Sequence, residues 1–150
     1  MAKRKRRKKR AGKPPPKCKA ILLCEQTLVD EETERVTASD IFNVLSLPGF
    51  PTNAPPFTVF VQLVDGIGRY KVEVQIQDLR EDRVIATTPA VEVRFPQRLM
   101  IVMLIIPIPP LPLDHPGRYD VLVLANDQEI DRQQFIATNE DDDEEEDFEK

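Results

Sequence analysis

The single histidine, His115, is the side chain of this sequence best suited to proton transfer near neutral pH. Asp114 precedes it, and a histidine oriented by an acid is two thirds of a Ser-His-Asp site. The two serines, Ser39 and Ser46, belong to a distant segment, so nothing local supplies the nucleophile. We therefore expect His115 to be a surface-loop histidine, and the chain not to be an enzyme.

The two cysteines, Cys18 and Cys24, are the other candidates for reactive chemistry. If their segment is extended they lie roughly 20 Å apart, at about 3.3 Å per residue. That distance excludes an intrachain disulfide, which needs Cα atoms within about 7 Å. Two free thiols suit a reducing compartment, and one histidine is too few to complete a metal site with them. We expect packed thiols, no metal and no cofactor.

Three short motifs could bind a ligand, but each has a simpler interpretation. The turn Asp65-Gly66-Ile67-Gly68 lacks the third glycine and the following helix of a dinucleotide loop. The acidic run Asp30-Glu31-Glu32 lacks calcium-loop spacing and is typical of a solvated turn. Pro109-Pro110-Leu111-Pro112 is similar to ligands of WW domains, although its apolar neighbours favour a loop packed on the domain.

The strongest functional signal is a run of eight cations near the N-terminus. Residues 1–19 hold 11 Lys/Arg and no acid. Such a run can neutralise several phosphates and release their counterions, so binding would be salt-dependent. Without interleaved aromatics it cannot stack bases, and any nucleic-acid contact would be non-specific. The residues that we expect to make this contact are Lys3, Arg4, Lys5, Arg6, Arg7, Lys8, Lys9 and Arg10.

Two other interpretations of this basic arm remain open: a targeting signal in a nucleated host, and a solubilising tail. The C-terminal residues 140–150 hold 9 Asp/Glu and one Lys, whereas residues 20–139 hold 9 basic and 17 acidic residues. We hypothesise that this acidic tail folds onto the basic arm and competes with phosphate. Both tails have compositions typical of disorder.

The apolar segments match neither a signal peptide nor a membrane-spanning helix, and this bears on where the protein is expected to be. The apolar stretch after the basic arm, Ala20–Cys24, is too short for the h-region of a signal peptide. The longest apolar region, Met100–Leu113, is interrupted by prolines, which a membrane-spanning helix would not tolerate. We expect a soluble cytoplasmic protein with no membrane partner.

The middle of the chain reads as short strands between turn residues. Tyr70, Val72, Val74 and Ile76 alternate with polar residues, which predicts a half-buried antiparallel strand. Residues 35–47 are predicted to form one strand, and residues 99–106 a strand buried on both sides. The other predicted strands lie near residues 20–29, 57–64, 84–87, 91–95, 118–125 and 129–137.

The last two strands form a hairpin around Asn126-Asp127, because both residues tolerate the positive φ of a type I′ turn. Gly117 and Tyr119 precede it and resemble the tyrosine corner of immunoglobulin-like domains, in which the hydroxyl bonds to upstream backbone. The cysteine pair and core tryptophan of antibody domains are missing. These features predict an immunoglobulin-like antiparallel β-sandwich of 7–8 strands.

Residues 19–137 are similar to a family of small bacterial proteins of unknown function. The resemblance rests on an acidic turn, RVTASDIFNVLSLPGFP, PPFTVFVQL and PGRYDVLVLANDQEI, in that order. Asp40 stands where a glycine is common in that family, before Ile41-Phe42. The resemblance implies the sandwich fold and brings no activity, cofactor or catalytic residue.

The sequence thus predicts a disordered basic arm (1–18), a β-sandwich domain (19–138) and a disordered acidic tail (139–150). We expect a non-enzymatic binding or adaptor module, with an unidentified protein partner, whose arm contacts nucleic acid. The alternative is a structural or protein-interaction accessory domain whose tails serve solubility.

Overall fold

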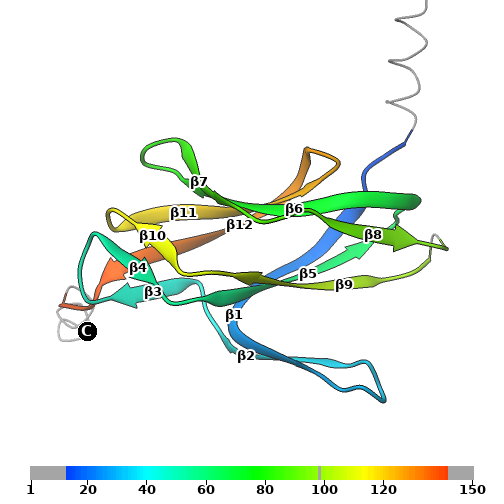
Figure 1. Ribbon diagram of the computed structural model, residues 1–150, viewed down its shortest axis with the longest axis horizontal. Helices are drawn as coiled ribbons and strands as arrows, with labels where there is room; N and C mark the ends of the chain where they lie inside the picture. The colour runs from blue at the N-terminus through cyan, green and yellow to red at the C-terminus, as the bar shows by residue number, and fades with distance from the viewer. Residues whose placement is uncertain (1–12, 98, 142–150) are drawn as a thin grey trace, which may run out of the picture.

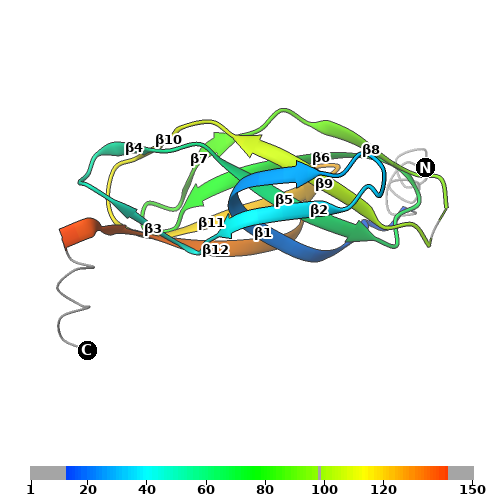
Figure 2. The same ribbon diagram turned by 90° about the horizontal axis from the view of Figure 1, so that it is seen from below.

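The computed structural model describes residues 13–97 and 99–141 of the 150, and this part of the chain is all-β. Two sheets lie over each other along the long axis of the molecule (Figure 1). The described chain starts at one end of that axis and finishes at the other, as the second view also shows (Figure 2). No helix in the described ranges is long and apolar enough to cross a membrane.

The four-stranded sheet has the order β2-β1-β5-β9. Its strands are β1 (Lys17–Val29), β2 (Val36–Ile41), β5 (Phe57–Val64) and β9 (Val102–Ile108), and all its pairs are antiparallel. β1 begins two residues before the predicted start of the ordered domain. Beyond the sheet, β1 and β2 continue as a projecting hairpin, visible at the bottom of Figure 1.

The second sheet has the order β3-β12-β11-β6-β7, with β8 also paired to β6. Its strands are β3 (Val44–Leu47), β6 (Gly68–Asp78), β7 (Arg83–Thr87), β8 (Val91–Phe95), β11 (Gly117–Ala125) and β12 (Gln128–Asn139). β3 runs parallel to β12, which departs from the all-antiparallel prediction. A small separate pair, β4 (Thr52–Ala54) and β10 (Leu111–Leu113), completes the twelve strands of the described chain.

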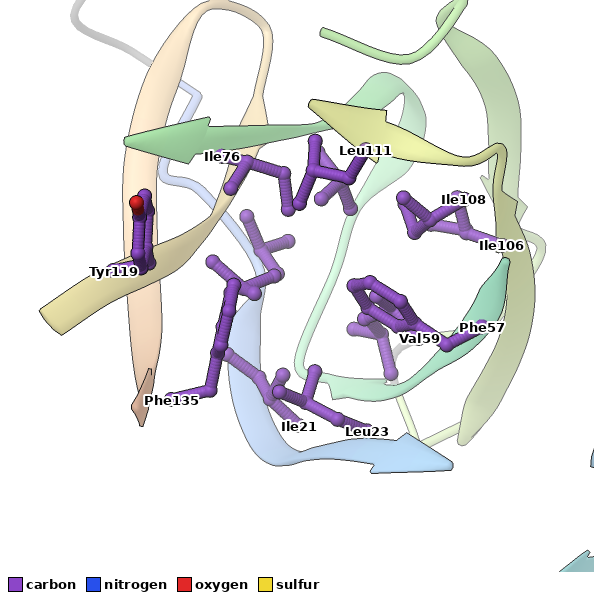
Figure 3. Packing of buried hydrophobic residues seen from close by; sticks show 14 of the residues in the cluster. Ile21, Leu23, Phe57, Val59, Ile76, Ile106, Ile108, Leu111, Tyr119 and Phe135 are labelled. Carbon is purple, nitrogen blue, oxygen red and sulfur yellow. The ribbon is translucent and has the colours of Figure 1, made fainter. Parts of the chain in front are cut away.

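The core lies between the two sheets and is built by the alternation of each strand. β5 contributes Val59, Val61 and Leu63, and β6 contributes Tyr70, Val72, Val74 and Ile76. Tyr119 and Phe135 meet these residues from β11 and β12, and Ile21 and Leu23 from β1 (Figure 3). Each fully buried Val, Leu or Ile contributes about 1.5–3 kcal/mol, so this contiguous cluster is the main source of stability.

The single strand predicted over residues 35–47 is wrong, because the chain changes sheets in its middle. Asp40 has φ 55°, and Phe42 makes the last bond to β1, its N–H donating to Leu23 O at 2.8 Å. Ile136 N–H then donates to Asn43 O at 2.9 Å, and β3 continues beside β12. A positive φ disfavours most side chains and is adopted most easily by glycine.

The prediction that residues 99–106 are buried on both sides is also wrong. β9 is an edge strand that pairs with β5, and no other layer covers its outer face within the described ranges. Ile106 and Ile108 point into the core, whereas Met103 is 42% exposed and Leu99 is 91% exposed. A continuous apolar run cannot by itself distinguish an edge strand from a central one.

The closing hairpin has the predicted turn geometry. Asn126 and Asp127 have φ 50° and 67°, and the strands on either side of them pair from Ala125↔Gln128 onward. Asn126 N–H donates to Lys71 O at 2.8 Å, so the turn is also tied to β6. The hairpin and β6 together form the central part of the six-stranded sheet.

Candidate functional site

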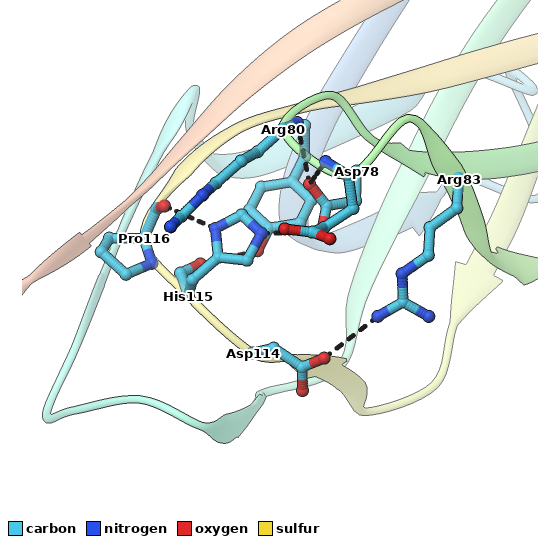
Figure 4. A network of polar contacts seen from close by, with 8 residues as sticks. Asp78, Arg80, Arg83, Asp114, His115 and Pro116 are labelled. Carbon is cyan, nitrogen blue, oxygen red and sulfur yellow. Dashed lines mark hydrogen bonds and ion pairs between the residues drawn. The ribbon is translucent and has the colours of Figure 1, made fainter.

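His115 forms an ion pair with Asp78 at the end of β6 (Figure 4). The distance from His115 Nε2 to Asp78 Oδ2 is 2.7 Å, and the two side chains are 13% and 2% exposed. Asp78 Oδ1 accepts hydrogen bonds from the N–H groups of Arg80 (3.0 Å) and Glu81 (3.2 Å) in the turn after β6. The pair therefore joins the turn after β6 to the loop before β11.

The second ring nitrogen of His115 also faces a hydrogen-bond acceptor. Nδ1 lies 2.7 Å from the carbonyl oxygen of Pro116, which can only accept. Since Asp78 also accepts when ionised, both contacts favour the doubly protonated imidazolium. The hydrogen bond to Pro116 raises the pKa of His115 most; burial opposes it, and Asp78 adds to the rise.

Asp78 has a lowered pKa although it is buried. Burial would raise the pKa of Asp78, but the N–H of Glu81 and the charged ring of His115 outweigh it, so the pKa lies below its usual range. A nearby ion pair, Arg83 Nη2 to Asp114 Oδ2 at 3.0 Å, lies on the exposed side of the same corner. Asp114, the sequence neighbour of His115, is thus not the acid that pairs with it.

Tyr119 completes this corner from the core side. Its hydroxyl donates to His115 O at 2.6 Å, which is the geometry of a tyrosine corner. Its ring stacks on His115 (5.7 Å between centroids) and on Phe135 (5.3 Å). Burial raises the pKa of Tyr119 to about 12, so the hydroxyl stays a donor. Gly117, at φ 140°, lets the chain turn from the loop into β11.

The prediction of a surface-loop histidine is wrong, because His115 is mostly buried and paired. The acid is 37 residues away in the sequence, so proximity along the chain could not find it. A signal did exist in the alternation of β6: Tyr70, Val72, Val74 and Ile76 point inward, which places Asp78 inward as well. A buried carboxylate needs a partner, and the one histidine was available.

This arrangement stabilises the corner and is poorly suited to proton transfer. Both nitrogens of His115 are engaged in hydrogen bonds, so neither can act as a base while the corner is intact. The serines are in other strands: Ser39 pairs opposite Gln26 in β1–β2, and Ser46 lies 3.4 Å from the hydroxyl of Thr138. The described chain also contains no group of three His, Cys, Asp or Glu side chains placed to hold a metal ion.

The two cysteines are free, and their surroundings do not activate them. Burial and the charge of Asp131 raise the pKa of Cys18 to about 11, and burial raises the pKa of Cys24. Because the thiolate is the reactive form, both thiols are poor nucleophiles near neutral pH.

The predicted nucleic-acid contacts, Lys3–Arg10, lie outside the described residues. What the structure does place is the segment that follows them. Tyr70 Oη donates to Pro14 O at 2.9 Å and accepts from the N–H of Ile67 at 2.9 Å. The Lys13 ammonium lies 4.1 Å above the Tyr70 ring and donates to Arg69 O. The arm therefore enters the domain beside the turn between β5 and β6.

Comparison with known proteins gives a family and little else. A family model described as "Family of unknown function (DUF6941)" matches residues 19–138. No curated protein matches the chain. Among solved structures, it is similar to the Pseudomonas fluorescens alkylpurine DNA glycosylase AlkC bound to DNA containing an abasic site analog. That match has 15% identity and a TM-score of 0.43, and it covers 63% of this chain and 27% of the other.

Proposed function

The chain belongs to the DUF6941 family of unknown function, and we propose that it is a non-enzymatic binding module whose basic N-terminal arm contacts nucleic acid without sequence specificity. Its domain serves as a rigid base for the arm and as an adaptor toward a protein partner. We place this module in the cytoplasm. It needs no cofactor.

We further propose that the domain is an immunoglobulin-like sandwich. Three features support this assignment: two facing sheets around one core, a corner closed by Tyr119 and His115, and a final hairpin at Asn126-Asp127. The parallel β3–β12 pair is a further edge interaction that sandwiches of this kind can carry without changing the order of the central strands.

The nucleic-acid proposal rests on the contacts that fix the root of the arm, Lys13 and Pro14 at the start of the described chain, to the domain. Lys13 and Pro14 are fixed to Arg69 and Tyr70, so eight consecutive cations are covalently attached at one defined end of the domain. This root lies at the opposite end of the domain from the end of β12, after which the acidic sequence follows. Such an arm would bind phosphates by counterion release and show a steep salt dependence.

The test replaces all eight cations of Lys3–Arg10 with glutamine in the full chain. This variant keeps Lys13–Lys17, whose contacts with the domain a truncation would remove. Binding to a mixed-sequence 20-base-pair DNA duplex should weaken by roughly 100-fold or more at about 50 mM salt, and the salt slope should become shallower. The matched control exchanges each Lys for Arg and each Arg for Lys, which retains the charge and should retain binding. Equal affinity of the glutamine variant and the wild type would refute the role of the arm.

A second candidate function is a purely structural or protein-interaction domain whose tails serve solubility. The exposed apolar row on the edge strand β9 and the segment before it favours this alternative, since such rows are common at interfaces. It predicts that the glutamine variant loses solubility and keeps its protein partners. Recovery of the same partners after nuclease treatment and at high salt would support it.

A further inference from the structure

Two arginines face each other directly across β6 and β8. Arg69 is the register partner of Arg94, and both side chains are exposed on the outer face of the sheet. Two residues along, the same face places Lys71 opposite Glu92, a pair of opposite charges. Like charges directly opposite each other destabilise a strand pair. The arginine pair thus carries a cost that its neighbour avoids.

Nothing in the described chain offsets that cost. No carboxylate in residues 13–97 and 99–141 forms an ion pair with either guanidinium, whereas Arg83 pairs with one carboxylate and Arg132 with two. Asp65, in the adjacent turn, is paired with Lys17 at 3.8 Å. Lys13 adds a third cation, with its ammonium beside Gly68 and Tyr70. This end of the sheet has an excess of positive charge and is short of an anion.

The arginines also line a surface cavity of ≈ 590 Å³. Its other walls include the turn at Gly66–Gly68 and the end of β8 at Phe95 and Pro96. At Gly66 a Cβ would lie 2.3 Å from the Phe95 ring, so this position admits no side chain and backbone forms the wall. The residues that line the cavity therefore combine two arginines with a glycine turn and apolar side chains.

We propose that this cavity, with Arg69 and Arg94 as its cationic walls, binds the phosphodiester backbone of a nucleic acid. The inference rests on the proposed function and extends it from the arm to the folded domain. Guanidinium groups hold phosphate oxygens with paired hydrogen bonds, and an anion between them would offset their mutual repulsion. The apolar wall at Ile67 and Pro96 suits a sugar beside the phosphate better than it suits a solvated carboxylate.

The root of the arm supports a nucleic acid as the occupant. Lys13 donates to the carbonyl of Arg69, and in the sequence only Ala11 and Gly12 separate Lys13 from the cationic run at residues 3–10. The arm would then supply most of the affinity, and the arginine pair would fix where the strand meets the domain.

The test compares full-length variants for binding to the 20-base-pair DNA duplex over a range of salt concentrations. The double substitution Arg69→Gln/Arg94→Gln should weaken binding by roughly tenfold at about 0.1 M salt and reduce the salt slope by about two. The matched control, Arg83→Gln/Arg118→Gln, removes the same charge near the His115 corner and should change neither. Arg69→Lys/Arg94→Lys should keep most of the salt slope. Thermal unfolding should show all three variants folded.

The outcomes separate this proposal from that of the arm. If the arginine variant binds like its matched control while the glutamine arm variant loses binding, the cavity is not a nucleic-acid site and the arm proposal stands. If the arginine variant loses binding and the arm variant does not, the cavity stands and the arm proposal fails. Equal binding of poly-glutamate, with the same dependence on Arg69 and Arg94, would overturn the assignment to phosphodiesters in favour of an acidic protein.

The NMR chemical shifts of backbone amides give a second test, which does not require tight binding. Inorganic pyrophosphate added to the full chain should shift the backbone amide signals of Gly66, Gly68 and Arg69. The amide of Arg118, at the other end of the same sheet, should stay unchanged. Shifts of equal size at both ends would show diffuse attraction to a basic surface and would contradict a site at the cavity.

Discussion

At the scale of single residues, the corner before β11 depends on three side chains that need one another. The ionised form of Asp78 is favoured by His115 and two backbone N–H groups, and the protonated form of His115 is favoured by its two acceptors. Tyr119 holds the backbone of His115 and covers its ring. The sequence identified Tyr119 through its motif. It did not reveal the ion pair, because Asp78 and His115 meet only after β6 and the loop before β11 are brought together.

Removing the Tyr119 hydroxyl tests the corner. Tyr119→Phe should reduce the free energy of unfolding by about 1–2 kcal/mol, because the carbonyl of His115 loses its donor in a place where water has little access. Denaturant unfolding measures this change, with an unchanged m-value showing that the fold is retained. A variant as stable as the wild type would mean that the hydroxyl bond contributes nothing.

The pH dependence of stability tests the charges of the corner. Since the pKa of His115 is raised from 6.5 in the folded protein, its contribution is complete below about pH 6.5 and is lost as the pH rises through the folded value. Since the pKa of Asp78 is lowered from 3.8, its contribution is complete above about pH 3.8 and is lost as the pH falls through its folded value. The pair should therefore stabilise most between these limits.

The measurement is the difference in unfolding free energy between wild type and Asp78→Asn/His115→Gln at pH 5 and pH 9. The difference should be larger at pH 5, because at pH 9 the wild type has lost the proton that its pair requires. A difference that does not vary with pH would show that the pair contributes as packing rather than as charge.

At the scale of elements, period-2 alternation was a good guide wherever a strand has neighbours on both sides. β6 and β11 were both predicted as strands, since their inward faces are apolar except for Asp78 at the end of β6. The burial of β9 was predicted wrongly because Leu99–Ile106 is apolar on both faces. Only the sheet order shows that one face of this strand is open. The change of sheet after β2 is a matter of tertiary pairing, and a local pattern carries little information about it.

Asp40 marks that change of sheet and allows a test. At φ 55° an aspartate is strained relative to glycine, so Asp40→Gly should leave the protein equally stable or up to about 1 kcal/mol more stable. Asp40→Ala should destabilise it, since alanine has neither the freedom of glycine nor a side chain that bonds locally. Thermal unfolding of the three proteins gives the order, and alanine ranking above glycine would contradict a left-handed conformation at this position.

At the scale of the whole molecule, composition predicted the separation of charge and the structure adds its direction. The basic arm joins the domain at Lys13, beside the turn between β5 and β6, and the acidic sequence continues from β12 at the opposite end. β12 alone has 12 residues, which is about 40 Å at 3.3 Å per residue. The hypothesis that the two tails pair falls on residues outside the described ranges, but their points of attachment are far apart. The arginine pair was not foreseen, since only the register of β6 and β8 brings Arg69 and Arg94 together.

The basic sequence joins one end of the described domain and the acidic sequence continues from the other, so the two charged segments are attached at opposite ends of its long axis. Beside a long polyanion, a molecule with its charges attached in this way would turn its basic end toward the polymer and its acidic end outward. Neighbours bound in this way would present like-charged tips to one another and to the solvent. Molecules bound side by side in this way would repel one another through their acidic ends, and the outermost surface would keep its negative charge.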